Sequence, residues 1–126
     1  MRDKAQENWG VGITCLSRNH LNAAANRLYY GVFQAVLWYA KRKKLYPETP
    51  DFDKRRKVHF EMGQLVNSEF SINGDYGKRM RHAFSEFLAL RLTADYEPET
   101  PSIDEIKEIV QDGQALKDHY LKAAGA

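Results

Sequence analysis

The feature that most constrains this chain is an almost unbroken apolar and aromatic run over residues 23–40, AAANRLYYGVFQAVLWYA. Its polar interruptions are the pair Asn26-Arg27 and, further on, Gln34. A helix that is apolar on all sides has to be buried on most of them. The apolar stretch is too short to span a bilayer and is broken by Gln34. We therefore expect it to form the central helix of a core, with no membrane contact.

An arginine in such surroundings needs a partner, because an unpaired buried charge is strongly unfavourable. Residues 91–96, RLTADY, offer Asp95 as a partner for Arg27, and they bring a second arginine at position 91. Arg91 and Asp95 have the four-residue spacing at which side chains meet on one helical face. We expect one polar cluster from both stretches, made of Asn26, Arg27, Tyr30, Arg91, Asp95 and Tyr96. Two interpretations are open: a network that fixes helix packing, or a site that holds a phosphate.

The rest of the chain has helical rather than strand periodicity. We expect helices over residues 3–17, 21–45, from 51 or 53 to about 70, 75–96 and 103–122, separated by proline loops at 46–50 and 97–101. Asn19 or Asn22 is the expected N-cap of the second helix, and Ser102 with Glu105 forms a capping box before the last. Trp9, Ile13 and Leu16 are the expected inner stripe of the first helix.

At 126 residues the chain is long enough for one domain with its own core. Short loops between helices predict an all-α fold, an up-and-down bundle of about five helices over residues 1–126. Cys15 is the only cysteine, which suits a reducing cytoplasm, and residues 1–20 lack an apolar block of signal-peptide length. No metal-ligand spacing and no glycine-rich phosphate loop occurs, so neither a metal nor a cofactor is expected.

Charge is unevenly distributed along the sequence. Eight basic residues fall within the 17 positions from 41 to 57: Lys41, Arg42, Lys43, Lys44, Lys54, Arg55, Arg56 and Lys57. Residues 95–112 instead hold seven acids and one base. The basic stretch is either a solvated face or an RNA-binding patch, because so many cations repel one another without a polyanion. The acidic stretch is the alternative binding surface, for a protein partner.

The two motifs resemble those of the HEPN family (higher eukaryotes and prokaryotes nucleotide-binding). Residues 26–35, NRLYYGVFQA, are similar to the family's Arg-x-Tyr-Tyr helix, and residues 91–96, RLTADY, are similar to its later Arg-x-x-Ala-Asp-Tyr element. The resemblance implies a small helical homodimer that binds RNA or a nucleotide. It also implies a role in a toxin–antitoxin or defence system, with a partner encoded nearby such as a nucleotidyltransferase.

Active family members are metal-independent ribonucleases that carry an Arg and a His with four to six residues between them. In that chemistry the His moves the proton and the Arg holds the phosphate. Here the expected His position after Arg91 is Tyr96, and neither Arg55–His59 nor Arg79–His82 has the required spacing. We therefore expect a binding module without efficient nuclease activity.

Two alternative functions remain open. One is an endoribonuclease with a variant set drawn from His59, His82 and Arg91. The other is a protein–protein adaptor that uses the acidic stretch.

Overall fold

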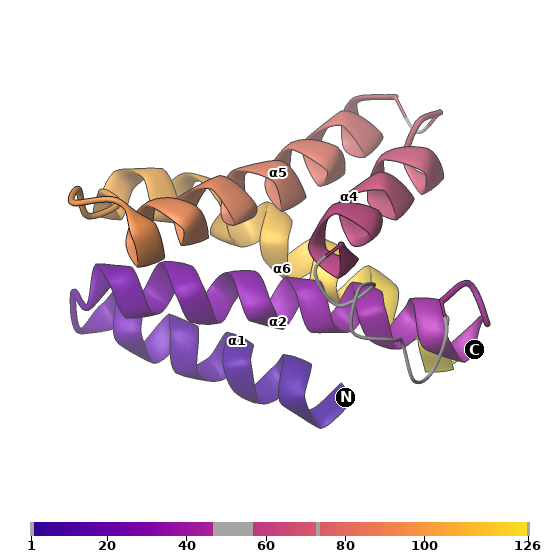
Figure 1. The fold of residues 1–126 in the computed structure, drawn as a ribbon, viewed down its shortest axis with the longest axis horizontal. Coiled ribbons are helices and arrows are strands. Elements are labelled where there is room, and N and C mark those ends of the chain that lie inside the picture. Colours follow the sequence, from indigo (N-terminus) through magenta and orange to yellow (C-terminus); the bar gives the residue numbers. More distant parts are fainter. Residues whose placement is uncertain (1, 47–56, 73, 126) are drawn as a thin grey trace.

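A computed structural model describes residues 2–46, 57–72 and 74–125 of this chain. Within these ranges five helices and no strand are present. The helices are α1 Arg2–Ser17, α2 Leu21–Arg42, α4 Val58–Glu69, α5 Gly74–Tyr96 and α6 Ile103–Gly125. Figure 1 shows α1 and α2 as an antiparallel hairpin, with α5 along the opposite side of α2 and α4 crossing obliquely. The expected all-α bundle is confirmed.

The apolar run forms the central helix of the bundle. α2 contacts α1, α4, α5 and α6. Eleven of its residues are buried: Ala24, Ala25, Leu28, Tyr29, Gly31, Val32, Phe33, Ala35, Val36, Leu37 and Ala40. In the described part of the chain, no helix combines the length and apolar character that crossing a membrane requires.

Two helices end in left-handed turns that the sequence analysis did not predict. Asn19 has a φ of 61°, and the His20 amide returns to the Cys15 carbonyl at 2.8 Å. Lys44 has a φ of 58°, and the Leu45 amide returns to the Ala40 carbonyl at 2.7 Å. Both are Schellman turns, in which a left-handed residue satisfies the last carbonyls of a helix.

These turns correct two predictions about α2. The helix ends at Arg42 rather than at residue 45, because Lys44 has left the helical conformation. Its N-cap is His20, which makes no side-chain capping bond, so neither Asn19 nor Asn22 caps it. Asn19 instead terminates α1.

The remaining element boundaries follow the sequence more closely. The capping box is confirmed: the Glu105 amide donates to the Ser102 hydroxyl at 3.1 Å, and the Ser102 amide donates to the Glu105 carboxylate at 3.3 Å. Ile13 was wrongly assigned to the inner stripe of α1, since it is exposed while Trp9 is buried. The expected start of the third helix at 51 or 53, and positions 47–50 of the proline loop, lie outside the described residues.

The carboxylate of Glu69 links three helices through partly buried hydrogen bonds. Glu69, the last residue of α4, accepts a hydrogen bond from the Tyr39 hydroxyl of α2 at 2.6 Å and from the Tyr120 hydroxyl of α6 at 2.8 Å. The bond to Glu69, with burial, raises the pKa of Tyr39 to about 12. Burial and the same carboxylate raise the pKa of Tyr120. These two hydrogen bonds, called the Glu69 clamp below, fix the end of α4 and so orient the whole helix against α2.

Candidate functional site

The side chain of Arg91 on α5 is the centre of the polar cluster. It is only 14% exposed, and its Nε lies 3.0 Å from Oδ2 of Asp95, one turn later. The Nε–H does not point along this contact, so the two groups form an ion pair rather than a hydrogen bond. Nη2 donates to the Tyr30 hydroxyl of α2 at 3.1 Å. The expected pairing of Arg91 with Asp95 is confirmed.

Asn26 completes the link between α2 and α5. Its amide nitrogen donates to both carboxylate oxygens of Asp95, at 3.2 and 3.0 Å. Asp95 therefore holds a cation from its own helix and an amide from the neighbouring one. The two sequence motifs meet in space at this carboxylate.

The predicted pairing of Arg27 with Asp95 is wrong. Arg27 is exposed, and its Nη1 donates to Oδ1 of Asn8 on α1 at 3.2 Å. The Asn8 amide in turn donates to Gln34 at 2.8 Å. Successive residues point about 100° apart around a helix. Asn26 therefore faces α5 while its neighbour Arg27 faces α1, and the cation lies at the surface rather than in the core.

Tyrosine rings surround the guanidinium of Arg91. Its Cζ lies 5.9, 5.4 and 5.7 Å from the ring centroids of Tyr29, Tyr30 and Tyr96, within the range of cation–π attraction. Tyr96 is 70% exposed, so it flanks the guanidinium from the solvent side. Nη1 has no hydrogen-bond partner among the described residues and is not sealed from solvent. One edge of the guanidinium is therefore available to an anion.

His59 on α4 belongs to the same cluster, which its sequence spacing did not reveal. Its Nδ1 lies 2.6 Å from the Tyr29 hydroxyl, and its ring stacks on Phe33 with centroids 4.2 Å apart. The ring centroid of Tyr30, which accepts the bond from Arg91, is 5.9 Å away. Burial, with the positive charge of Arg91, lowers the pKa of His59. His59 is therefore neutral near pH 7.

The other histidine candidate is not brought to this cluster. His82 is exposed on α5, nine residues before Arg91. That separation corresponds to about 13 Å along the helix axis, at 1.5 Å per residue. A chemical role that needs a histidine beside Arg91 is therefore assigned to His59 rather than to His82.

The basic stretch is described only in part. Lys41, Arg42, Lys43 and Lys44 lie at or just beyond the C-terminal end of α2, and Lys57 directly precedes α4. Lys54, Arg55 and Arg56 lie outside the described residues. Lys57 is exposed at the N-terminus of α4, which is the positive end of the helix dipole. His59 lies in the first turn of this helix, so positive groups approach the Arg91 cluster from α4 as well as from α5.

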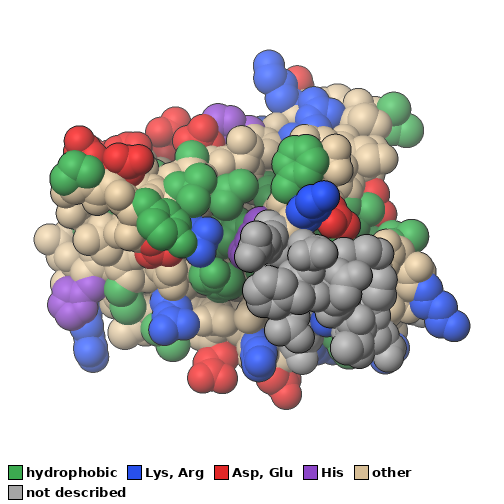
Figure 2. Space-filling view, viewed as in Figure 1, with side chains coloured by type: hydrophobic (Ala, Val, Ile, Leu, Met, Phe, Trp, Pro, Cys, Tyr) green, Lys and Arg blue, Asp and Glu red, His purple; other side chains and the backbone are tan. Residues whose placement is uncertain are grey.

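Figure 2 shows apolar side chains gathered on the face where α5 runs along α2. Tyr96 and Leu92 are among the exposed large side chains of α5. Together with the tyrosines around Arg91, this face offers flat aromatic surface next to a largely buried cation that keeps one edge open. Such a combination suits the phosphate and the base of a nucleotide better than it suits a simple anion.

No protein-family model, curated protein or solved structure matched this chain. The resemblance to the HEPN family therefore rests on the two motifs themselves, with Tyr30 from the first in contact with Arg91 from the second.

Proposed function

We propose that this chain is a HEPN-type module that binds single-stranded RNA through its phosphates and lacks efficient nuclease activity. The observation that carries the proposal is the guanidinium of Arg91, which is held in place by Asp95 and Tyr30 but keeps Nη1 free. A positioned guanidinium with one open edge is well suited to a phosphate oxygen.

The surroundings of Arg91 support RNA rather than an isolated inorganic anion. Tyr96 and Tyr30 offer ring faces beside the cation, and stacking on aromatic side chains accounts for much of the affinity of single-strand binders. The lysines at the end of α2 would extend the contact along the backbone. Lys41 lies eleven residues after Tyr30, or about 17 Å along the helix.

The proposal includes the homodimer and the toxin–antitoxin or defence role that the family resemblance implies. Both are tested apart from RNA binding. Sedimentation of the purified chain gives its oligomeric state. Co-purification with the products of neighbouring genes, a nucleotidyltransferase among them, tests the partner, and the exposed acids Glu97, Glu99 and Asp104 are the surface an adaptor would use.

The test of RNA binding is a filter-binding titration of single-stranded RNA across a range of salt concentrations. Affinity should fall steeply with salt, with a log–log slope of about −0.7 per phosphate contacted. Arg91→Gln should weaken binding about tenfold or more and make the slope shallower. Arg79→Gln is the matched control, because Arg79 lies on the same helix and pairs with Asp112 at 3.8 Å. Absence of RNA affinity at low salt would overturn the proposal.

One observation favours a second candidate, a metal-independent endoribonuclease. His59 is neutral and adjoins the same Tyr30 ring that Arg91 faces. If Nδ1–H of His59 donates to the Tyr29 hydroxyl, Nε2 is left as a base for a ribose 2′-hydroxyl, with Arg91 beside the phosphate. RNA cleavage in EDTA that is lost in His59→Ala and retained in His82→Ala would support this reaction. Cleavage that survives both substitutions would exclude it.

A further inference from the structure

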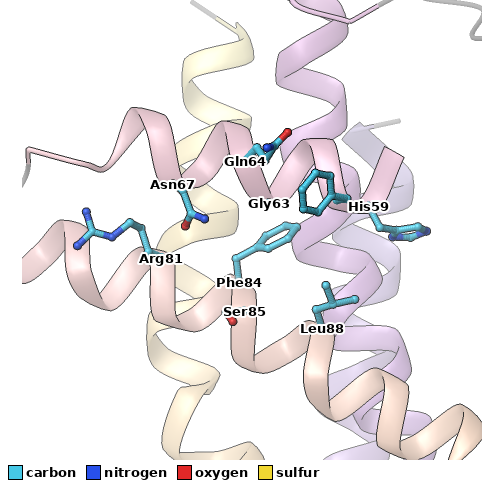
Figure 3. A pocket seen from close by; sticks show the side chains of 9 residues that line it. His59, Gly63, Gln64, Asn67, Arg81, Phe84, Ser85 and Leu88 are labelled. Carbon is cyan, nitrogen blue, oxygen red and sulfur yellow. The ribbon is translucent and has the colours of Figure 1, made fainter. Parts of the chain in front are cut away.

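The structure contains a pocket next to the Arg91 cluster that the phosphate contact does not use. It lies between α4 and α5 and has a volume of about 220 Å³. His59 lines one end, so the same side chain that adjoins Tyr30 also forms a wall of the pocket. Figure 3 shows Phe84 and Leu88 of α5 pointing into the space between the two helices, opposite Gly63 of α4.

The floor of the pocket is flat and aromatic. Phe84 is buried, and a Cβ at Gly63 would lie 3.3 Å from its Cε1 atom. The absence of a side chain at Gly63 thus lets α4 pack closely against the ring of Phe84. Phe60, also in the lining, is 66% exposed and makes no ring contact with the described residues. The ring of Phe60 is therefore accessible to a flat ligand that enters the pocket.

The polar groups of the pocket are neutral or cationic. Asn67 points into the gap between the helices, toward the side on which Arg81 lies, and the hydroxyl of Ser85 belongs to the same lining. Neither Asn67 nor Ser85 makes a side-chain hydrogen bond to the described residues, whereas Arg81 donates from Nη1 to the Phe70 carbonyl at 2.8 Å. No carboxylate is among the described lining residues. An amide offers a donor and an acceptor in one plane, as the edge of a nucleobase does.

We propose that the pocket between α4 and α5 binds one unpaired nucleobase of the RNA whose phosphate contacts Arg91. The volume fits this occupant, because pockets for drug-sized ligands begin at about 300 Å³ and a single base is smaller. The base stacks on the exposed ring of Phe60, and its edge meets the amide of Asn67. His59 joins the two halves of the site, with the pocket on one side and the Tyr30–Arg91 contact on the other. This inference rests on the proposed function.

The experiment compares two labelled probes of equal length and charge by fluorescence anisotropy at low salt: a short oligoadenylate and an abasic ribose-phosphate oligomer. The oligoadenylate should bind about tenfold more tightly, as expected when one base is stacked. Phe60→Ala and Asn67→Leu should remove that difference and leave the affinity for the abasic probe unchanged. Both residues are exposed on α4, so the substitutions do not remove core packing. Gln111→Leu on the exposed face of α6 is the control.

The outcomes separate the two proposals. Equal affinity for the two probes in the unsubstituted protein would overturn the base pocket and leave phosphate binding in place. A base-dependent difference that persists in both Phe60→Ala and Asn67→Leu would also overturn it, because the base would then be bound elsewhere. Binding of neither probe would overturn phosphate binding and the base pocket together.

Discussion

The Tyr29 hydroxyl and the Nδ1 atom of His59 lie 2.6 Å apart and join α2 to α4 beneath the Arg91 cluster. Burial raises the pKa of Tyr29, so this hydroxyl keeps its proton at all physiological pH values. The bond can be made in either direction, with Tyr29 donating to Nδ1 or with Nδ1–H donating to the phenol oxygen. In both cases the neutral imidazole is the form that the fold accommodates.

His59 should make the stability of the protein depend on pH. Its folded pKa lies below the ordinary value of 6.5, because burial and Arg91 disfavour the charged ring. Above 6.5 the ring is neutral in the folded and unfolded states. As the pH falls below 6.5, the unfolded chain takes up a proton before the folded protein does, so the free energy of unfolding decreases. Urea unfolding from about pH 7 to about pH 5 measures this decrease.

His59→Asn keeps a hydrogen-bonding group near Tyr29 and removes the titration. This variant should show a smaller loss of stability over the same pH range than the unsubstituted protein. His82→Asn, at an exposed position of α5, is the matched control for the substitution itself. Identical pH profiles for His59→Asn and the unsubstituted protein would contradict the assignment.

The variant Asp95→Ala distinguishes the two interpretations of the Arg91 cluster, a network that only fixes helix packing and a site that binds phosphate. Loss of the ion pair to Arg91 and of the acceptor for Asn26 should lower the free energy of unfolding by about 1 kcal/mol, because the carboxylate is partly exposed. RNA affinity should instead rise roughly fivefold. Removing a negative charge about 4 Å from a phosphate site is worth about 1 kcal/mol in water. Urea unfolding and RNA titration of the same variant measure the two effects.

Asp112→Ala is the control for net charge. It also removes one carboxylate, and the arginine that loses its partner, Arg79, lies on α5 as Arg91 does. A site at Arg91 requires a larger gain in RNA affinity from Asp95→Ala than from Asp112→Ala. Lower stability with unchanged RNA affinity would show that the cluster serves packing alone.

The parts of the structure that could be predicted from the sequence are local. The capping box at Ser102 and Glu105 and the ion pair of Arg91 with Asp95 each depend on residues three or four positions apart on one helix. The central position of α2 follows from its composition, since so apolar a helix has no stable place at the surface.

The parts that could not be predicted depend on how the helices pack. Arg27 and Asn26 are neighbours in sequence, and only the positions of α1 and α5 decide which of them faces Asp95. The sequence did not show that His59 lies beside Arg91, because no fixed spacing relates the two residues, whereas the crossing of α4 over α2 brings them together. Asn19 is favoured both as an N-cap and in a left-handed turn, so its type alone did not distinguish the start of α2 from the end of α1.

The clamp on Glu69 should be a major contributor to the docking of α4. Tyr120→Phe removes a buried hydrogen bond to a carboxylate, so it should lower the free energy of unfolding by about 2 kcal/mol. Tyr39→Phe should cost less, since Tyr39 is only half-buried. Urea unfolding of each single variant and of the double variant measures the two costs. Their sum should differ from the cost of the double variant, because both hydroxyls share one carboxylate.

The Glu69 clamp also predicts that the free energy of unfolding decreases at alkaline pH. The pKa of Tyr39 is raised to about 12, by the bond to Glu69 first and by burial second. As the pH rises above the ordinary tyrosine value of 10, the unfolded chain loses its proton before the folded protein does, so stability falls. Glu69→Gln should lower the pKa of Tyr39 in a titration followed by tyrosinate absorbance. An unchanged titration in Glu69→Gln would rule out the carboxylate as the cause.

Two glycines two residues apart on α1 should respond in opposite directions to alanine. At Gly12 a Cβ would lie 2.7 Å from Cγ of Leu28 and 2.9 Å from its backbone nitrogen, so α1 and α2 would have to move apart. Gly12→Ala should therefore lower the free energy of unfolding by about 1–3 kcal/mol. At Gly10 a Cβ would meet no atom within 4 Å, and Gly10→Ala should raise stability by about 0.5–1 kcal/mol through helix propensity alone. Urea unfolding of the two variants measures both effects, and a stabilising Gly12→Ala would mean that α1 does not pack against Leu28 in this way.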